Sequence, residues 1–167
     1  MPIGPARRGG RVDRLGFMDI GDTAPAFTLD DETGEPRSLD DLVKDGPVVL
    51  FFYPLAMSAG CTAEACHFRD LAAEFGALGA TPVGISTDAV ERQAEFSRKH
   101  SLGYPLLSDT GGEIAEVFGV RRKITIVPTK RKTFIIGAGR EIIGVVKSEM
   151  NMRAHADKAL ELLKART

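Results

Sequence analysis

Residues 47–76 have the sequence PVVLFFYPLAMSAGCTAEACHFRDLAAEFG. The run from Pro47 to Tyr53 is continuously apolar, β-branched and aromatic, which is typical of a strand buried on both faces. From Cys61 onward the pattern becomes helical, with apolar residues recurring at steps of three or four: Ala65, Phe68, Ala72 and Phe75. The stretch therefore predicts a buried strand, a loop that begins at Pro54, and a helix whose first residue is Cys61.

The sequence on either side of this unit predicts further strands and helices. Before it, residues 26–29 predict a short strand and residues 38–43 one helical turn. After it, residues 81–87 predict a second buried strand, residues 89–100 a helix capped by Asp88, residues 106–109 a short extended segment and residues 112–118 a short helix.

The C-terminal part predicts a hairpin and a last helix. Residues 133–136 and 141–146 are apolar runs on either side of Gly137-Ala138-Gly139-Arg140. Asn151 is expected to cap a helix on which Ala156, Leu160 and Leu163 share one face. The whole order predicts one α/β domain with a thioredoxin-like fold, in which a mixed central sheet has helices on both faces.

Composition and charge exclude several classes of protein. The chain has 167 residues, of which 43% are hydrophobic, enough for one core. Its formal net charge of -1 favours neither nucleic acid nor an anionic membrane as a partner. No stretch of about 18 apolar residues occurs, so no membrane span is expected.

The N-terminal segment differs from the rest of the chain. Residues 1–17 carry four arginines and one acid, and lack the apolar run of a secretory signal. We interpret them as a disordered basic tail before a domain over residues 18–167. The two cysteines, five residues apart, do not resemble a secreted disulfide framework, so we expect a cytoplasmic protein whose thiols are reactive.

The junction between the predicted strand and helix has the chemistry of a reactive thiol. Free N–H groups and the positive end of the helix dipole favour a thiolate at Cys61. Ser58 can direct a hydroxyl at that thiolate or at a bound oxygen, and Pro54 can shield one side from water. Splitting an O–O bond leaves negative charge on the departing oxygen, and Arg131 is the candidate for a charged donor to it. Local capping is the alternative for Ser58 and for Glu64.

These residues resemble the active site of peroxiredoxins. The spacing Pro-x-x-x-Ser-x-x-Cys at Pro54, Ser58 and Cys61 is similar to the signature of that family. Residues 60–70, GCTAEACHFRD, resemble the bacterioferritin comigratory protein subfamily, also called PrxQ. The subfamily usually has Thr-Pro-Gly before the cysteine, whereas this chain has Ser58-Ala59-Gly60, a difference that bears on the rigidity of the loop.

The resemblance implies a function and roles for the residues. It implies a peroxidase that reduces hydroperoxides through a Cys61 sulfenic acid, is resolved by Cys66 and is recycled by thioredoxin or a similar dithiol protein. It also implies that Glu64 orients Arg131, that the protein is a monomer, and that no cofactor is bound.

Helix geometry adds a constraint to this cycle. In an unbroken helix, residues five apart have Cα atoms roughly 8.7 Å from each other, whereas a disulfide needs less than about 7 Å. We therefore expect the first turns of the helix to unwind before Cys61 and Cys66 can join.

Other functions stay open from the residues alone. Cys66 could be inert, which would leave a one-cysteine peroxidase. A redox sensor would share the first oxidation step, and a dithiol oxidoreductase would share the fold but usually has Cys-x-x-Cys. His67 beside Cys66 suggests zinc, but Cys61, Cys66 and His67 supply only three ligands in one short helix, so we expect no metal.

Overall fold

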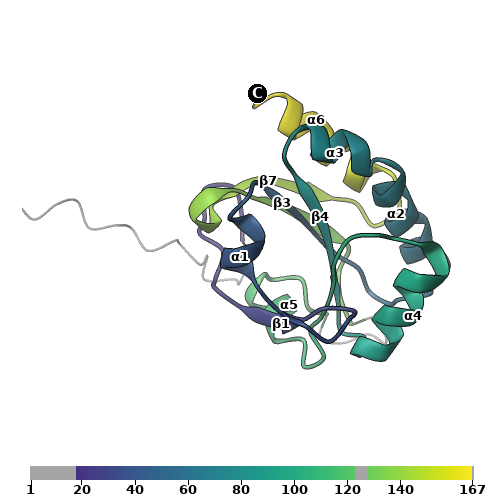
Figure 1. Ribbon diagram of the computed structural model, residues 1–167. Helices are drawn as coiled ribbons and strands as arrows, with labels where there is room; N and C mark the ends of the chain where they lie inside the picture. The colour runs from purple at the N-terminus through teal and green to yellow at the C-terminus, as the bar shows by residue number, and fades with distance from the viewer. Residues whose placement is uncertain (1–17, 123–127, 167) are drawn as a thin grey trace, which may run out of the picture.

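The computed structural model describes residues 18–122 and 128–166. Its centre is a five-stranded sheet of strand order β5-β4-β3-β6-β7 (Figure 1). The strands are β3 Val48–Phe52, β4 Thr81–Ser86, β5 Leu106–Ser108, β6 Lys132–Ile136 and β7 Ile142–Lys147. β3, β4 and β5 run parallel, whereas β6 is antiparallel to β3 and β7 is antiparallel to β6. The sheet is therefore mixed, as the sequence predicts.

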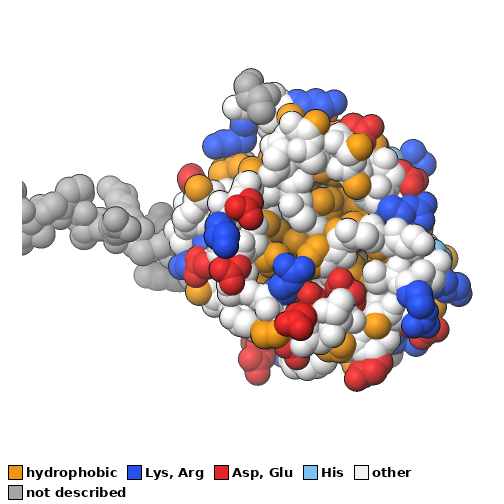
Figure 2. All heavy atoms as spheres, in the orientation of Figure 1, with side chains coloured by type: hydrophobic (Ala, Val, Ile, Leu, Met, Phe, Trp, Pro, Cys, Tyr) orange, Lys and Arg blue, Asp and Glu red, His pale blue; other side chains and the backbone are white. Residues whose placement is uncertain are grey.

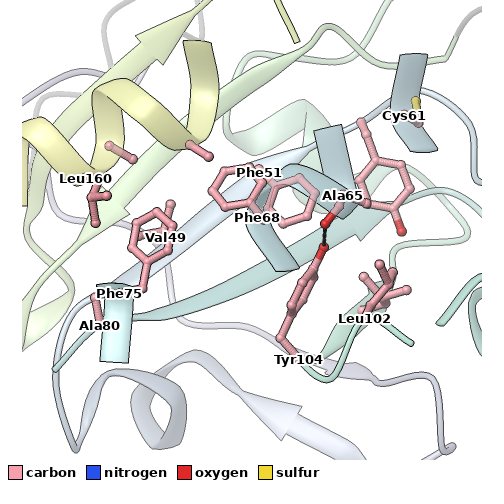
Figure 3. Close-up of a cluster of buried hydrophobic side chains, with 14 of the residues drawn as sticks. Val49, Phe51, Cys61, Ala65, Phe68, Phe75, Ala80, Leu102, Tyr104 and Leu160 are labelled. Carbon is pink, nitrogen blue, oxygen red and sulfur yellow. Dashed lines mark hydrogen bonds between the residues drawn. The ribbon is translucent and has the colours of Figure 1, made fainter. Parts of the chain in front are cut away.

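Strand β3 lies at the centre of the sheet, and all five of its residues are buried. Its side chains alternate between two hydrophobic cores, since successive residues of a strand point to opposite faces. Val49 and Phe51 belong to the first core, drawn in part in Figure 3, whereas Leu50 and Phe52 belong to the second. This explains why the sequence of β3 is apolar without alternation.

Helices cover both faces of the sheet (Figure 1). Four of them place buried side chains in the first core: α2 Ala59–Asp70, α3 Ala72–Ala77, α4 Val90–His100 and α6 Ala154–Lys164. Two short helices contribute to the second core, α1 Leu39–Val43 and α5 Glu113–Val117. The predicted thioredoxin-like arrangement of helices on both faces is confirmed.

Aromatic stacking holds α2 against the centre of the sheet. The ring of Phe68 on α2 stacks on Phe51 of β3, with the ring centroids 4.2 Å apart. Phe75 of α3 also stacks with Phe68, with the ring centroids 5.8 Å apart. The helix that carries both cysteines is thus anchored through a residue two positions after Cys66.

Two local predictions are wrong, and one predicted strand is shifted. The helix predicted from Cys61 begins at Ala59, and Leu71 divides it into α2 and α3. Asp88 does not cap α4, because its carboxylate accepts hydrogen bonds from Ala56 N and Ser86 Oγ instead. The strand predicted over residues 26–29 is present as β1 Thr28–Asp30, and it pairs with β2 Pro36–Ser38, which the sequence analysis did not predict.

The C-terminal hairpin and helix agree with the prediction. β6 and β7 pair around a short 3-10 helix, Ala138–Arg140. Asn151 Oδ1 accepts a hydrogen bond from Ala154 N at the start of α6, and Ala156, Leu160 and Leu163 are buried on one side of it. The hairpin places the residue before β6, Arg131, at the end of the sheet where β3 leads into α2, because Lys132 pairs with Phe52.

The segment interpreted as a basic tail, residues 1–17, lies outside the described residues. Within the described part of the chain, no helix has both the length and the apolar content needed to cross a membrane. Figure 2 shows acidic and basic side chains interspersed over the face that it presents. On that face, charge of one sign is not gathered into a single patch.

Candidate active site

The loop from β3 to α2 carries the first group of candidate residues. Pro54, which is half-buried, lies two residues after the end of β3, and Ser58 is the N-cap residue of α2. The hydroxyl of Ser58 accepts a hydrogen bond from Cys61 N at 3.4 Å and donates one to the carbonyl of Leu55 at 2.9 Å. In this geometry the hydroxyl serves the helix cap, which was the alternative role expected for it. Cys61 lies in the first turn of α2, not at its first position.

Cys61 meets Arg131 in a buried contact. The thiol is 1% exposed, and Arg131 Nη2 lies 3.4 Å from Cys61 Sγ. The guanidinium also donates through Nη1 to Glu64 Oε2 at 2.6 Å. One cluster therefore contains Cys61 and Glu64 of α2 together with Arg131, which lies far away in sequence, directly before β6. The contact expected between Glu64 and Arg131 is present.

Burial and charge act in opposite directions on this cluster. Burial raises the pKa of Glu64, and the guanidinium of Arg131 opposes that rise. Burial lowers the pKa of Arg131, but the neighbouring Glu64 and Cys61 more than compensate and hold it above its ordinary value. Arg131 is therefore a permanent positive charge beside the sulfur.

The space around Arg131 is tight at Gly60. A Cβ atom added at Gly60 would lie 3.3 Å from Arg131 Nη2 and 3.4 Å from Met152 Cε. Any side chain at this position would press on the guanidinium that contacts Cys61. Met57, earlier in the same loop, has a positive φ of 72°, a backbone conformation that costs energy in a residue with a side chain.

Cys66 has a different environment. It is half-buried, and both cysteines are free thiols. Helix α2 is continuous from Ala59 to Asp70, so Cys61 and Cys66 both lie in helical backbone. Their Cα atoms are then roughly 8.7 Å apart by ideal helix geometry, too far for a disulfide without a change in backbone.

A buried polar network behind the loop was not predicted from the sequence. Asp88 accepts from Ala56 N at 2.8 Å and from Ser86 Oγ at 2.7 Å, and Gln93 Nε2 donates to Ser86 Oγ at 2.9 Å. The hydroxyl of Tyr53 donates to Gln93 Oε1. This network fixes the loop that precedes Cys61 against β4 and α4. Its signal in the sequence was Gln93, a polar residue three positions before Phe96 on the buried face of α4.

A second unpredicted contact supports the segment after β7. His155 is fully buried, and its Nε2 lies 2.7 Å from the carbonyl of Ser148. A carbonyl only accepts, so Nε2 carries the proton and Nδ1 accepts from Thr133 Oγ1, 2.8 Å away. Burial lowers the pKa of His155, which keeps the ring neutral. The ring thus joins α6 to β6 two residues from Arg131.

Metal ligands are not grouped in the described residues. Across 18–122 and 128–166, no three His, Cys, Asp or Glu side chains lie together so as to hold a metal ion. His67 Nε2 lies 2.7 Å from Asp157 Oδ1. It joins α2 to α6.

The chain is similar to a known family and to several known proteins. Residues 20–145 match the AhpC/TSA family. A curated protein of Mycobacterium tuberculosis that carries a peroxiredoxin name is 55% identical over 150 residues, which cover 89% of this chain and 97% of the relative. The chain belongs to the AhpC/TSA family of peroxiredoxins. A chloroplastic peroxiredoxin Q of Sedum lineare is 37% identical over 87% of this chain and 77% of its own length.

Solved peroxiredoxin structures agree with the fold. The crystal structure of peroxidoxin BcpB from Mycobacterium tuberculosis matches with a TM-score of 0.87 and 54% identity, covering 90% of this chain and 99% of the other. Peroxiredoxin Q of Xanthomonas campestris matches with a TM-score of 0.78 and 27% identity, covering 84% of this chain and 92% of the other. The resemblance to the PrxQ subfamily is thus confirmed, and this peroxiredoxin is a thiol-dependent peroxidase.

Proposed function

We propose that Cys61 is the thiolate that attacks the hydroperoxide. Its sulfur takes the terminal oxygen, the O–O bond breaks, and the departing hydroxide or alkoxide takes up a proton to leave as water or alcohol. Cys61 becomes a sulfenic acid. The single observation that carries this assignment is the buried contact between Cys61 Sγ and Arg131 Nη2 at 3.4 Å.

We propose that Arg131 stabilises both the thiolate and the departing oxygen. The guanidinium has five N–H donors, of which one is used for Glu64 and one for Cys61. Its Nε is buried and has no hydrogen-bond partner among the described residues. The donors that remain suit a peroxide whose charge grows as the bond breaks. Glu64 would hold the planar group in place, and Pro54 and Ser58 would shape the loop from which the peroxide approaches.

Cys66 is proposed as the resolving cysteine. Its thiolate would attack the sulfur of the Cys61 sulfenic acid, release hydroxide and form a disulfide. Because both residues lie in continuous α2, the segment between them has to leave the helix first. Resolution is then a conformational step, separate from the attack on the peroxide.

The reductant and the substrates follow from the family. Peroxiredoxins use peroxide substrates and thioredoxin-like reductants, and we propose a thioredoxin-like dithiol protein for recycling this one. The Xanthomonas campestris bacterioferritin comigratory protein, 27% identical, is described as reducing alkyl peroxides. We therefore propose organic hydroperoxides beside hydrogen peroxide.

Compartment and assembly are part of the same proposal. Two thiols that must be re-reduced after every turnover suit a reducing compartment, the cytoplasm. Both cysteines, Glu64 and Arg131 come from a single chain. A monomer therefore holds all the groups that the cycle requires.

Mass spectrometry after peroxide treatment tests the cycle. We expect a Cys61–Cys66 disulfide in the unaltered protein, a sulfinic or sulfonic Cys61 in a Cys66→Ser variant, and no rapid oxidation in a Cys61→Ser variant. Rapid oxidation of Cys66 in the Cys61→Ser variant would contradict the assignment. Turnover with thioredoxin, its reductase and NADPH separates this peroxidase from a sensor, which would be oxidised once and stop. If the Cys66→Ser variant turned over as fast as the unaltered protein, a one-cysteine mechanism would hold.

A further inference from the structure

A cavity of about 320 Å³ opens where β6 begins and β7 ends. The residues that line it are Gly119, Lys130, Arg131, Lys132, Lys147, Ser148 and Glu149. Three of these residues are lysines. The cavity thus has an excess of positive charge in its lining.

The strand register forces two of these charges together. Lys132 on β6 pairs directly with Lys147 on β7, and directly opposed residues point to the same face of a sheet. Like charges in this position repel each other, and the repulsion is stronger where water is excluded. Lys132 is only 6% exposed. A buried lysine beside a second lysine is an unfavourable arrangement unless something negative compensates it.

The described side chains compensate only part of this charge. Within them, no carboxylate lies within 4.0 Å of the ammonium group of Lys132 or Lys147. The ring of Phe134 lies under Lys132 Nζ at 4.9 Å, and Asp19 attracts the charge from further away. Burial and then the charge of Lys147 lower the pKa of Lys132.

Glu149 is the one acid that lines the cavity, and it is already engaged. Its Oε1 lies 2.9 Å from Arg122 Nη2 and accepts a hydrogen bond from Arg131 N at 3.3 Å. Its charge is thus shared with two other groups. Lys132 and Lys147 therefore lack a carboxylate of their own among the described residues.

The cavity lies on the other side of the sheet from Cys61. Lys132 alternates with Phe134 and Ile136, whose side chains belong to the second core. Cys61 belongs to the first core, and Arg131 directs its side chain to that face. The two lysines therefore lie on the opposite face from the peroxide site, although Arg131 also lines the cavity.

We propose that this cavity binds a small phosphate-type oxyanion. Such an anion would lie between the ammonium groups of Lys132 and Lys147 and remove their mutual repulsion. Ser148 offers a third donor, because its Oγ accepts from Asn151 N at 3.0 Å and keeps its own proton free to donate. The volume admits inorganic phosphate or the phosphate group of a small ester.

The experiment is thermal unfolding at constant ionic strength, with inorganic phosphate replacing chloride. We expect phosphate to raise the Tm of the unaltered protein, because a ligand that binds only the folded state stabilises it. In a Lys132→Met variant this rise should vanish, and the variant should melt above the unaltered protein in chloride, since the repulsion is gone. A Lys44→Met variant, with an exposed lysine changed at the end of α1, should keep the full phosphate effect.

A second lysine variant and a second ligand complete the test. Lys147→Met, at an exposed strand end, should also lose the phosphate effect, and it serves if Lys132→Met does not fold. Glycerol phosphate replaces inorganic phosphate in a parallel series; an equal rise shows that esters are admitted, and a rise with inorganic phosphate alone restricts the site to the free ion. The absence of any rise in the unaltered protein, or an equal rise in all variants, would overturn the proposal.

Discussion

The first turns of α2, around Cys61 and Glu64, contact a buried charge, whereas the turn that follows them contacts neutral or exposed groups. Arg131 reaches Cys61 and Glu64 at 3.4 Å and 2.6 Å. In the later part, the hydroxyl of Tyr104 donates to the carbonyl of Ala65 at 2.6 Å (Figure 3), and His67 meets Asp157 at 2.7 Å. The side chain of Asp157 is 57% exposed.

This difference corresponds to the two steps of the proposed cycle. Attack on a peroxide requires donors that are already in position, so the contacts around Cys61 are buried and ionic. Resolution requires the backbone between the cysteines to open, and Ala65, whose carbonyl Tyr104 holds, lies directly before Cys66. A single hydrogen bond such as the one from Tyr104 contributes little free energy, so it favours the helix but still permits the backbone of α2 to open. Phe68, stacked on Phe51, marks where the anchored part of α2 begins.

Replacing Arg131 should have the largest effect, and it acts on the first step alone. In an Arg131→Gln variant, the rate constant for reaction of Cys61 with hydrogen peroxide should fall by roughly 10²- to 10³-fold, the usual loss when one charge-stabilising donor is removed. Rapid quenching and mass spectrometry of the sulfenic acid would measure it. The matched control is Arg122→Gln, because Arg122 pairs with Glu149 and makes no contact with Cys61. Equal losses in both variants would contradict a specific role for Arg131.

Replacing Tyr104 should have a smaller effect, and it acts on the second step. Burial raises the pKa of Tyr104 well above its ordinary value, so its hydroxyl stays a donor. Loss of this hydrogen bond in Tyr104→Phe should cost about 1 kcal/mol and raise the open population of α2, and hence disulfide formation, roughly fivefold. Hydrogen exchange over residues 61–68 should quicken in parallel, while the reaction with peroxide stays unchanged.

The control for this variant is the other tyrosine. Tyr53→Phe also removes a buried hydroxyl, but one that bonds Gln93 and not the backbone of α2. Its hydrogen exchange over residues 61–68 should remain that of the unaltered protein. If Tyr104→Phe left both the exchange and the rate of disulfide formation unchanged, opening of α2 would not limit resolution.

The sequence predicts the parts of the site that are local along the chain. The run from Pro47 to Tyr53, the helical spacing after Cys61 and the hairpin around Gly137 depend on short-range patterns, and the structure confirms each of them. Arg131 could be placed near Cys61 only because the predicted order of strands put its strand beside β3, and the resemblance to peroxiredoxins pointed to the same residue.

The remaining contacts were missed because they join distant segments through polar atoms. Asp88 was interpreted as a helix cap, since its position before α4 suits that role, yet its carboxylate turns to Ala56 N in the loop before Cys61. Tyr104 and His155 stand outside every motif that the sequence analysis used. A burial pattern does not tell which buried polar atom has a partner, and a single sequence carries no signal for the pairing of Tyr104 with Ala65.

Replacing Asp157 should have the smallest effect, and it tests the contact between His67 on α2 and Asp157 on α6. The carboxylate of Asp157 is 57% exposed, and a contact with an exposed carboxylate contributes little, so Asp157→Asn should speed disulfide formation only about twofold. Glu161→Gln removes a charge from the same helix without touching α2 and should leave the rate as it was. Asp157→Asn could instead accelerate disulfide formation as much as Tyr104→Phe does. The contact between His67 and Asp157 would then hold α2 closed as firmly as the buried hydrogen bond from Tyr104 to Ala65, and burial would not distinguish the two contacts.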